Sequence, residues 1–115
     1  MTAHNKLSQA NLVSSIQKDI KMDRVSADIR QGVNKRFINA ICNHNNELVL
    51  EYLKNGMSVT KECMGKEPMF YAVTHNNFGA ILLLLKYGAI LDKEYLEESN
   101  KNFSKEALEF LASLL

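Results

Sequence analysis

Apolar residues recur at helical spacing in several stretches of this chain, with polar residues between them. Phe37, Ile38 and Ile41 mark one short helix, and residues 48–53 mark a second helix with the same kind of apolar stripe. Gly56 follows that second stretch, at the place where a residue in the left-handed conformation ends a helix. The same order of features recurs further along the chain. The pattern therefore predicts an all-α fold built from pairs of short helices.

This recurrence is a sequence repeat. The first copy, from Arg36, reads RFINAICNHNNELVLEYLKNGMSVT, and the second, from Pro68, reads PMFYAVTHNNFGAILLLLKYGAILD. The period from Arg36 to Pro68, with two helical segments in each copy, is typical of stacked repeat proteins. The copies match at Ala40 and Ala72, Asn45 and Asn77, Val49 and Ile81, Leu53 and Leu85, Lys54 and Lys86, Gly56 and Gly88, and Val59 and Leu91. Each of these pairs is separated by the same distance in sequence as Arg36 and Pro68, which we call the repeat spacing.

The second copy carries a further sequence of features that resembles an ankyrin repeat. Pro68 begins its first helix, Asn76 stands in the helix-helix turn where a left-handed residue is needed, and the copy closes on a Gly-Ala pair at Gly88. The threonine and histidine of the family's Thr-Pro-Leu-His block are absent, and Glu67 and Phe70 stand there instead. The resemblance implies an ankyrin-like helical solenoid of stacked antiparallel helix pairs with short β-turn fingers.

The chain is expected to form one domain with atypical units at both ends. Its 115 residues, 46% of them apolar, suffice for a single core. The first unit is a degenerate copy of the repeat. It lies closer to the next copy than the repeat spacing, so its finger should be missing or reduced. Terminal repeats differ because one of their faces has no neighbour. The expected division is 12–33 for an N-terminal capping repeat, 34–61 and 62–92 for two repeats, and 93–115 for C-terminal capping helices.

The resemblance also implies a binding surface, because proteins of this family bind partners with the finger tips and the exposed side of the inner helices. Met64 and Tyr87 place large side chains where the scaffold does not require them, and Tyr and Met are enriched at interfaces. The alternative is that Met64 folds back onto a neighbouring finger and Tyr87 is an ordinary surface residue. The predicted protein-binding residues are Cys42, Asn43, Asn55, Cys63, Met64, Lys66, Thr74, His75 and Tyr87.

Motifs for catalysis, cofactors or metals are not found in the sequence. It contains no Gly-rich phosphate loop, HExxH helix or Gly-x-Ser-x-Gly turn, so we expect no enzyme activity and no cofactor. Cys42, Cys63, His44 and His75 lack the spacing of zinc ligands. His44 is expected in the turn between two helices. The two cysteines are expected to be reduced thiols, and without an apolar run of signal-peptide or membrane-span length the protein is expected in the cytoplasm.

The leading hypothesis is a small inhibitor or adaptor that binds one protein partner; by analogy, such a protein would suit a bacterial, phage or viral effector. Residues 1–36 contain seven basic and three acidic residues, a charge of +4, whereas residues 37–115 contain seven and ten, a charge of −3. The basic third offers a weaker alternative, nucleic-acid binding that should fall steeply with salt. Its basic residues are Lys18, Lys21, Arg24, Arg30, Lys35 and Arg36.

A further alternative is a homodimer joined through the C-terminal leucines, which make that end less polar than a free solenoid end should be. Leu82 raises the same question, because it lies where the family usually has a charged residue facing water. We expect the C-terminal cap to cover Leu82, with Ser104 as the N-cap of the last helix. The residues of the alternative dimer contact are Leu111, Leu114 and Leu115.

Overall fold

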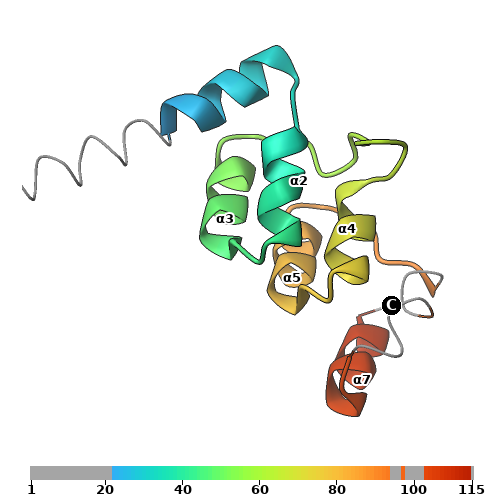
Figure 1. Cartoon of the computed structure of the whole chain (residues 1–115). Coiled ribbons are helices and arrows are strands. Elements are labelled where there is room, and N and C mark those ends of the chain that lie inside the picture. The colour runs from blue at the N-terminus through green and yellow to red at the C-terminus, as the bar shows by residue number, and fades with distance from the viewer. Residues whose placement is uncertain (1–21, 94–96, 98–102, 115) are drawn as a thin grey trace, which may run out of the picture.

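The computed structural model describes residues 22–93, 97 and 103–114, and within these ranges the chain is all-helical (Figure 1). The first part of the N-terminal capping repeat and most of the first expected C-terminal helix lie outside the described residues, as do Lys18, Lys21 and Leu115. No helix in the described ranges is long and apolar enough to cross a membrane. The helices are a segment at 22–31, α2 (Lys35–Cys42), α3 (Asn46–Lys54), α4 (Pro68–Thr74), α5 (Phe78–Lys86) and α7 (Lys105–Ser113).

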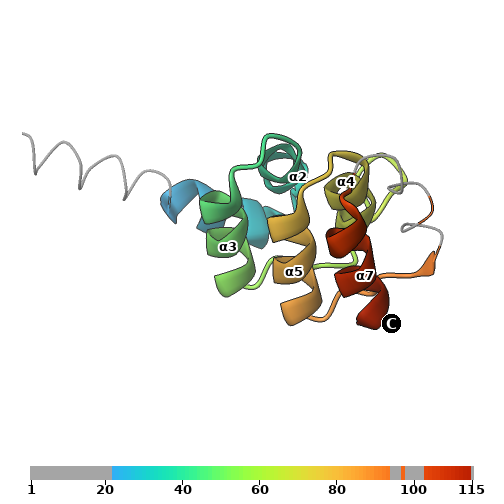
Figure 2. The same cartoon turned by 90° about the horizontal axis from the view of Figure 1, so that it is seen from below.

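The helices form two layers. Each helix of the first layer, α2 or α4, packs against the helix that follows it, α3 or α5. The two pairs then stack, because α2 contacts α4 and α3 contacts α5. Figure 2 shows α3, α5 and α7 side by side in one layer, with α2 and α4 in the other. Two consecutive helix pairs therefore stand in the same orientation, as expected from the repeat spacing.

The helices end in the same way in each unit. Gly56 and Gly88 adopt left-handed conformations with φ values of 97° and 100°. The residue after each glycine donates its N–H to a carbonyl in the last turn of the helix: Met57 to Tyr52 (3.0 Å) and Ala89 to Leu84 (2.9 Å). These bonds satisfy carbonyls that the helix itself leaves unpaired. The segment at 22–31 ends in the same way at Gly32, where Val33 N donates to Asp28 O at 2.9 Å, and we call this segment the first unit.

The turns within the two pairs are also equivalent. His44 and Asn76, which occupy matching positions of the two copies, both have positive φ, with values of 59° and 55°. The next residue in each copy caps the following helix: the Asn45 side chain accepts from Leu48 N, and the Asn77 side chain from Ala80 N. Asparagine favours both roles because its short side chain can hydrogen-bond to nearby backbone. The expected positions of His44 and Asn76 in these turns are confirmed.

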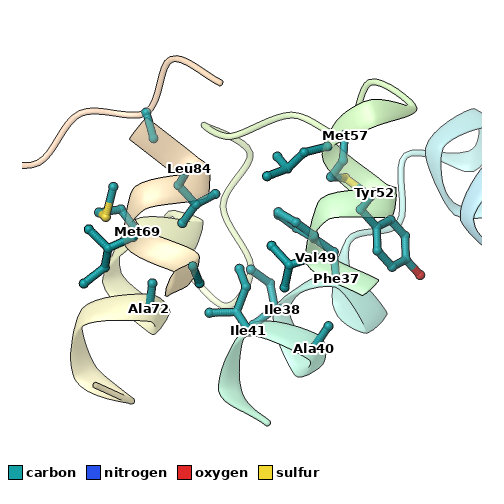
Figure 3. Packing of buried hydrophobic residues seen from close by; sticks show 14 of the residues in the cluster. Phe37, Ile38, Ala40, Ile41, Val49, Tyr52, Met57, Met69, Ala72 and Leu84 are labelled. Atoms are coloured by element: carbon teal, nitrogen blue, oxygen red, sulfur yellow. The ribbon is translucent and has the colours of Figure 1, made fainter. Parts of the chain in front are cut away.

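The core lies between the two layers and continues across both pairs (Figure 3). Several of its members occupy matching positions of the two copies: Phe37 and Met69 are both fully buried, as are Val49 and Ile81. A buried aliphatic or aromatic side chain contributes about 1.5–3 kcal/mol. The core residues are Val25, Phe37, Ile38, Ala40, Ile41, Val49, Tyr52, Leu53, Met57, Met69, Ala72, Val73, Ala80, Ile81, Leu84, Ala89, Leu91 and Leu111.

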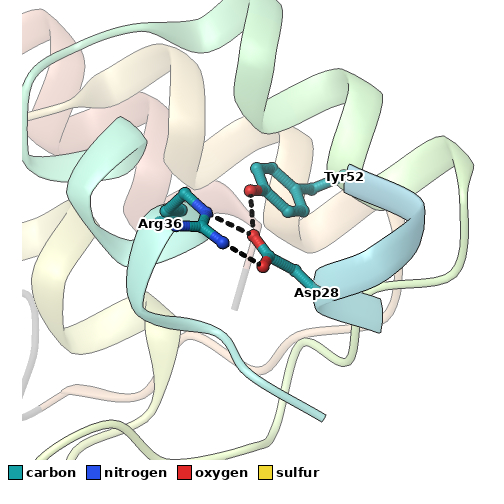
Figure 4. Close-up of polar contacts among 3 residues, drawn as sticks. All are labelled: Asp28, Arg36 and Tyr52. Atoms are coloured by element: carbon teal, nitrogen blue, oxygen red, sulfur yellow. Dashed lines mark hydrogen bonds and ion pairs between the residues drawn. The ribbon is translucent and has the colours of Figure 1, made fainter. Parts of the chain in front are cut away.

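The first unit is joined to the next by a buried charged side chain. Asp28 occupies the helix position that Tyr52 and Leu84 occupy in the later units, and it is only 1% exposed. Arg36 donates two hydrogen bonds to its carboxylate, from Nε (3.0 Å) and Nη2 (2.9 Å), and the Tyr52 hydroxyl donates a third at 2.6 Å (Figure 4). A buried carboxylate is tolerated when it is paired and hydrogen-bonded in this way. We call these three residues the Asp28 triad.

The Asp28 triad changes the pKa values of its members. Burial alone would raise the pKa of Asp28, but the hydrogen bonds from Arg36 and Tyr52 outweigh it, and the pKa lies below its usual value. Burial raises the pKa of Tyr52, and the hydrogen bond to the carboxylate raises it further. The folded state therefore favours a charged aspartate beside a neutral phenol.

A very short connection makes the Asp28 triad possible. Only residues 32–34 separate the first helical segment from α2, so the finger expected to be missing or reduced in this unit is indeed absent. Arg36, in the first turn of α2, is thereby held close to Asp28. Asn34 is buried in the same connection and donates its side-chain N–H to Lys61 O at 3.0 Å, which ties α2 to the loop after α3.

A single buried asparagine links the two complete helix pairs. Asn77 Nδ2 donates to Ile41 O and to Asn46 Oδ1, each at 2.8 Å, while its Oδ1 accepts from Asn46 Nδ2 at 2.9 Å and from Ala80 N at 3.1 Å. All the hydrogen-bonding groups of a side chain that is 1% exposed are thus satisfied. Gly79 leaves room for this amide pair, since a Cβ there would lie 2.5 Å from Asn46 Nδ2.

The C-terminal end of the stack is covered by α7. Phe78 of α5 packs against Phe103 and Phe110, with ring centroids 6.3 and 5.8 Å away. Leu82 is half-buried, and its coverage by the C-terminal cap stays a prediction. Ser104 caps α7, and its hydroxyl accepts from Ala107 N. The expected N-cap is therefore confirmed.

The lowered pKa of Asp28 predicts a loss of stability in acid that Asp28→Asn should not show. A folded-state pKa below the unfolded value of about 3.9 stabilises the fold at pH values above the unfolded value, and this stabilisation is lost as pH falls toward and through the lower folded-state pKa. At pH 7, Asp28→Asn should lower the free energy of unfolding by about 1.5–3 kcal/mol, because the hydrogen bonds from Arg36 and Tyr52 then no longer go to a charged acceptor. The deficit should shrink between about pH 5 and pH 3. Urea unfolding across that range measures it, and a constant deficit would contradict the prediction.

The two asparagine caps offer a matched comparison of local and long-range bonding. Asn45→Ala should cost about 0.5–1 kcal/mol, because Asn45 is exposed and makes only a cap bond. Asn77→Ala should cost about 2–4 kcal/mol, because it also leaves Ile41 O and the Asn46 amide without their partner. Urea unfolding of both variants gives the difference. Equal costs would show that Asn77 does not link the helix pairs.

Candidate functional site

The loop before α4 forms a tight hairpin with an exposed tip. Cys63 N donates to Lys66 O at 2.8 Å and Lys66 N donates to Cys63 O at 3.2 Å, with Met64 and Gly65 between them. Both central residues have positive φ, with values of 53° and 80°. Two-residue turns of this kind favour Asn-Gly, because most side chains clash in the left-handed conformation. Met64 therefore stands in a position for which its residue type is poorly suited.

Met64 projects into solvent from this tip. Its side chain is 93% exposed, so it does not fold back onto neighbouring structure. A methionine that neither packs nor suits the local backbone contributes nothing evident to folding. Met64 is therefore an exposed apolar residue at a position that its residue type does not favour.

The hairpin is anchored to the inner helices by a hydrogen bond and by packing. The Tyr71 hydroxyl, on α4, donates to Cys63 O. Lys66 Nζ lies over the Phe70 ring, 5.0 Å from its centroid, in a cation–π contact. Cys42, at the end of α2, and Cys63 are both half-buried against the core. The exposed tip thus stands on a base fixed by α4.

Burial and neighbouring groups raise the pKa values of Cys42 and Tyr71. Burial raises the pKa of the Cys42 thiol, and the neighbouring Cys63 raises it further. Burial likewise raises the pKa of Tyr71, with smaller contributions from Cys63 and Cys42. Since the thiolate is the nucleophilic form, a raised thiol pKa makes Cys42 less reactive. In the described part of the chain, no group of three or more His, Cys, Asp or Glu residues is placed to hold a metal ion.

A second set of the predicted residues lies at the carboxyl ends of α2 and α4. Asn43 and His75, at matching positions of the two copies, are the C-caps of these helices, and both are exposed. Thr74 is exposed beside them, and its hydroxyl donates to Tyr71 O at 3.4 Å. His44 Nε2 lies 2.8 Å from His75 O, a contact that joins the two turns. These residues form neighbouring polar surface on the two stacked units.

Asn55 and Tyr87 lie at the other end of the helix pairs. Each is the C-cap of an outer helix, α3 or α5, and the outer helices run antiparallel to the inner ones (Figure 1). Both are exposed, Tyr87 by 37%. The Asn55 side chain donates to Glu51 O at 2.7 Å and so completes its own helix end. The structure thus divides the predicted residues into the hairpin, the ends of the inner helices and the ends of the outer helices.

A hollow of about 400 Å³ opens beside the hairpin, and the sequence analysis did not predict it. It lies between the hairpin and the segment that follows α5, where Ile90 is 75% exposed. Comparison of the two copies would have revealed Ile90, because the equivalent position of the first copy is Ser58. The residues that line the hollow are Glu62, Gly65, Lys66, Glu67, Ile90 and Asp92.

The structure gives less support to the two alternative functions, a homodimer and nucleic-acid binding. Leu111 is fully buried against the core, so its expected role in a dimer contact is wrong, because the chain itself covers it. Leu114 remains 48% exposed. Arg36 was expected in a basic nucleic-acid surface, but its guanidinium is bonded to Asp28 and the ion pair offsets its charge. The side chains of Arg24, Arg30 and Lys35 are exposed.

Comparisons with known proteins give no assignment. No protein-family model, no curated protein and no solved structure matches the chain. Its function is therefore inferred from the geometry and chemistry of its own residues.

The anchoring bond of the hairpin predicts the behaviour of Tyr71→Phe. Loss of the hydroxyl removes a partner of Cys63 O while the ring remains packed, so the turn should open more often. Amide hydrogen exchange at Cys63 and Lys66 should accelerate by about tenfold, in line with one lost hydrogen bond. Exchange at Val49, in the core of α3, should change little by comparison. Equal acceleration at all three amides would instead indicate global destabilisation.

Proposed function

We propose that this chain is an ankyrin-like repeat protein and a non-enzymatic binding module, a small inhibitor or adaptor that covers a surface of one protein partner. Several features support the repeat assignment. The helix pairs stack in register at the repeat spacing, equivalent glycines end the outer helices, and a hairpin precedes the second pair. The expected cytoplasmic setting, in the cell of origin or in a host, belongs to the same proposal.

The observation that carries the binding role is Met64. A large apolar side chain is 93% exposed at the tip of a hairpin whose conformation disfavours it, and the hairpin is fixed by Tyr71. Methionine is an adaptable contact residue at binding surfaces. Rigid presentation lowers the entropy lost on association, because the tip is already ordered before binding.

The remaining contacts would come from residues on either side of the tip. Lys66 and Cys63 belong to the hairpin itself, and the exposed ends of α2 and α4 contribute Asn43, Thr74 and His75. Such a surface is small, so it suits one partner better than several. A dimer through the C-terminal leucines is less favoured, because Leu111 is buried within the chain.

A substitution at the tip separates binding from folding. Met64→Asn should raise the free energy of unfolding by about 0.5–1 kcal/mol, because asparagine tolerates positive φ better than methionine. The same variant should lose its partner, since the apolar contact is gone. Urea unfolding measures the first effect, and quantitative affinity capture from lysate of the source cell or its host measures the second.

The matched control is Leu114→Asn, which removes another exposed apolar side chain, at the far end of the chain. It should leave capture unchanged. A protein captured by wild type and by Leu114→Asn but lost with Met64→Asn would support the hairpin as the binding site. Capture that is equal for all three proteins, or lost only with Leu114→Asn, would refute it.

A further inference from the structure

Ile90 is an apolar residue at a position that the fold assigns to solvent. Its counterpart in the first copy, Ser58, is exposed, and its Oγ accepts from Thr60 N at 3.2 Å and Lys61 N at 3.1 Å. Those bonds shape the loop after α3, and an isoleucine cannot make them. Ile90 is instead 75% exposed in the segment after α5. Folding therefore does not account for an isoleucine at this place.

The surroundings of Ile90 are acidic. The hollow that it lines carries three carboxylates, those of Glu62, Glu67 and Asp92, against one ammonium, that of Lys66. In the described residues, neither Glu62 nor Glu67 forms an ion pair with a basic side chain. Lys66 Nζ is held over the Phe70 ring, on the hairpin side of the hollow. The result is an exposed apolar side chain beside two carboxylates, those of Glu62 and Glu67, that form no ion pair within the described residues.

We propose that this hollow binds a partner segment that places an apolar side chain against Ile90, with lysine or arginine residues on either side of it. The inference rests on the proposed function and specifies the chemistry of the partner. Burial of Ile90 contributes affinity, because it removes apolar surface from water. The carboxylates select basic neighbours and orient the segment, because complementary charges favour the correct encounter over others.

Other kinds of partner fit the hollow less well. A nucleic acid or an acidic segment would be repelled by the carboxylates of Glu62 and Glu67. A purely apolar segment would cover Glu62 and Glu67 without supplying charge partners, and burying unpaired carboxylates is costly. A basic segment with one apolar residue can cover Ile90 and also supply charge partners for Glu62 and Glu67.

The test is an NMR titration of the full, isotopically labelled chain with three short synthetic peptides. One peptide has a leucine between two pairs of arginines, the second has glycine in place of the leucine, and the third has glutamates in place of the arginines. The first should shift the amide signals of Glu62, Lys66 and Ile90. The second should bind about tenfold more weakly, in keeping with the loss of one buried apolar contact. The third should not bind.

Two variants localise the effect. Ile90→Ser, which introduces the residue of the first copy, should weaken binding of the leucine peptide about tenfold without unfolding the chain. Glu62→Gln with Glu67→Gln should weaken it several-fold and reduce its dependence on salt, because screened charge pairs are lost. Circular dichroism of each variant confirms that the helices are retained.

Three results would overturn the inference: binding that Ile90→Ser leaves unchanged, signal shifts confined to residues outside the hollow, or shifts of Ile90 that depend on protein concentration without peptide. The last result would mean that a second copy of the chain occupies the hollow. The broader proposal is tested separately. If Met64→Asn abolishes partner capture while Ile90→Ser does not, the hairpin is a binding site and the partner chemistry inferred for the hollow is wrong.

Discussion

Short helix pairs cannot bury their own apolar surface, and the structure depends on this constraint. The helices α2 to α5 have seven to nine residues, which is too short for stability in isolation. Each pair must therefore lie against a neighbour, and the core of the chain consists of the side chains at that contact, such as Phe37, Met69 and Ile81. Asn77 adds a polar link at the same contact, with its side chain bonded to Ile41 O and to Asn46.

The same constraint explains why the two ends differ from the middle. At the amino-terminal end, Asp28 takes the place of a core residue, forms an ion pair with Arg36 and accepts a hydrogen bond from Tyr52, so a charge-assisted contact joins the first unit. At the carboxyl-terminal end, Phe103, Phe110 and Leu111 cover the outer side of α5. The contact at the amino-terminal end is polar, and its hydrogen bonds require a defined geometry. The contact at the carboxyl-terminal end is apolar. Both satisfy the need of a terminal unit for a neighbour.

Among the exposed apolar side chains of the described residues, Met64 and Ile90 are by far the most exposed, at 93% and 75%. Met64 stands at the tip of a rigid hairpin, and Ile90 lines the hollow beside it. Gly65 follows Met64 in the chain and also lines the hollow, so the two features adjoin. Scattered apolar residues are normal on protein surfaces, but each of these two occupies a position where the local backbone or the repeat equivalent favours a polar residue. That departure distinguishes them from Tyr87, which lies at an ordinary helix end.

The sequence by itself determined the local elements of this protein. Gly56, Gly88, Asn76 and Ser104 act within a few residues of their own positions, so their roles in ending, turning or beginning helices could be inferred from type and spacing. The repeat spacing likewise predicted which positions are equivalent. The ankyrin-like assignment and the binding role remain proposals.

Only the tertiary structure decided which distant residues meet. The bond between Tyr52 and Asp28 joins positions 24 apart, and the bond between Asn77 and Ile41 joins positions 36 apart. The sequence around Tyr52 or Asn77 does not indicate these distant hydrogen-bond partners. The hollow at Ile90 and the burial of Leu111 also depend on how separate segments pack, because exposure is a property of the assembled surface. Local hydrogen bonding therefore placed the helices, and long-range packing decided which side chains stay exposed.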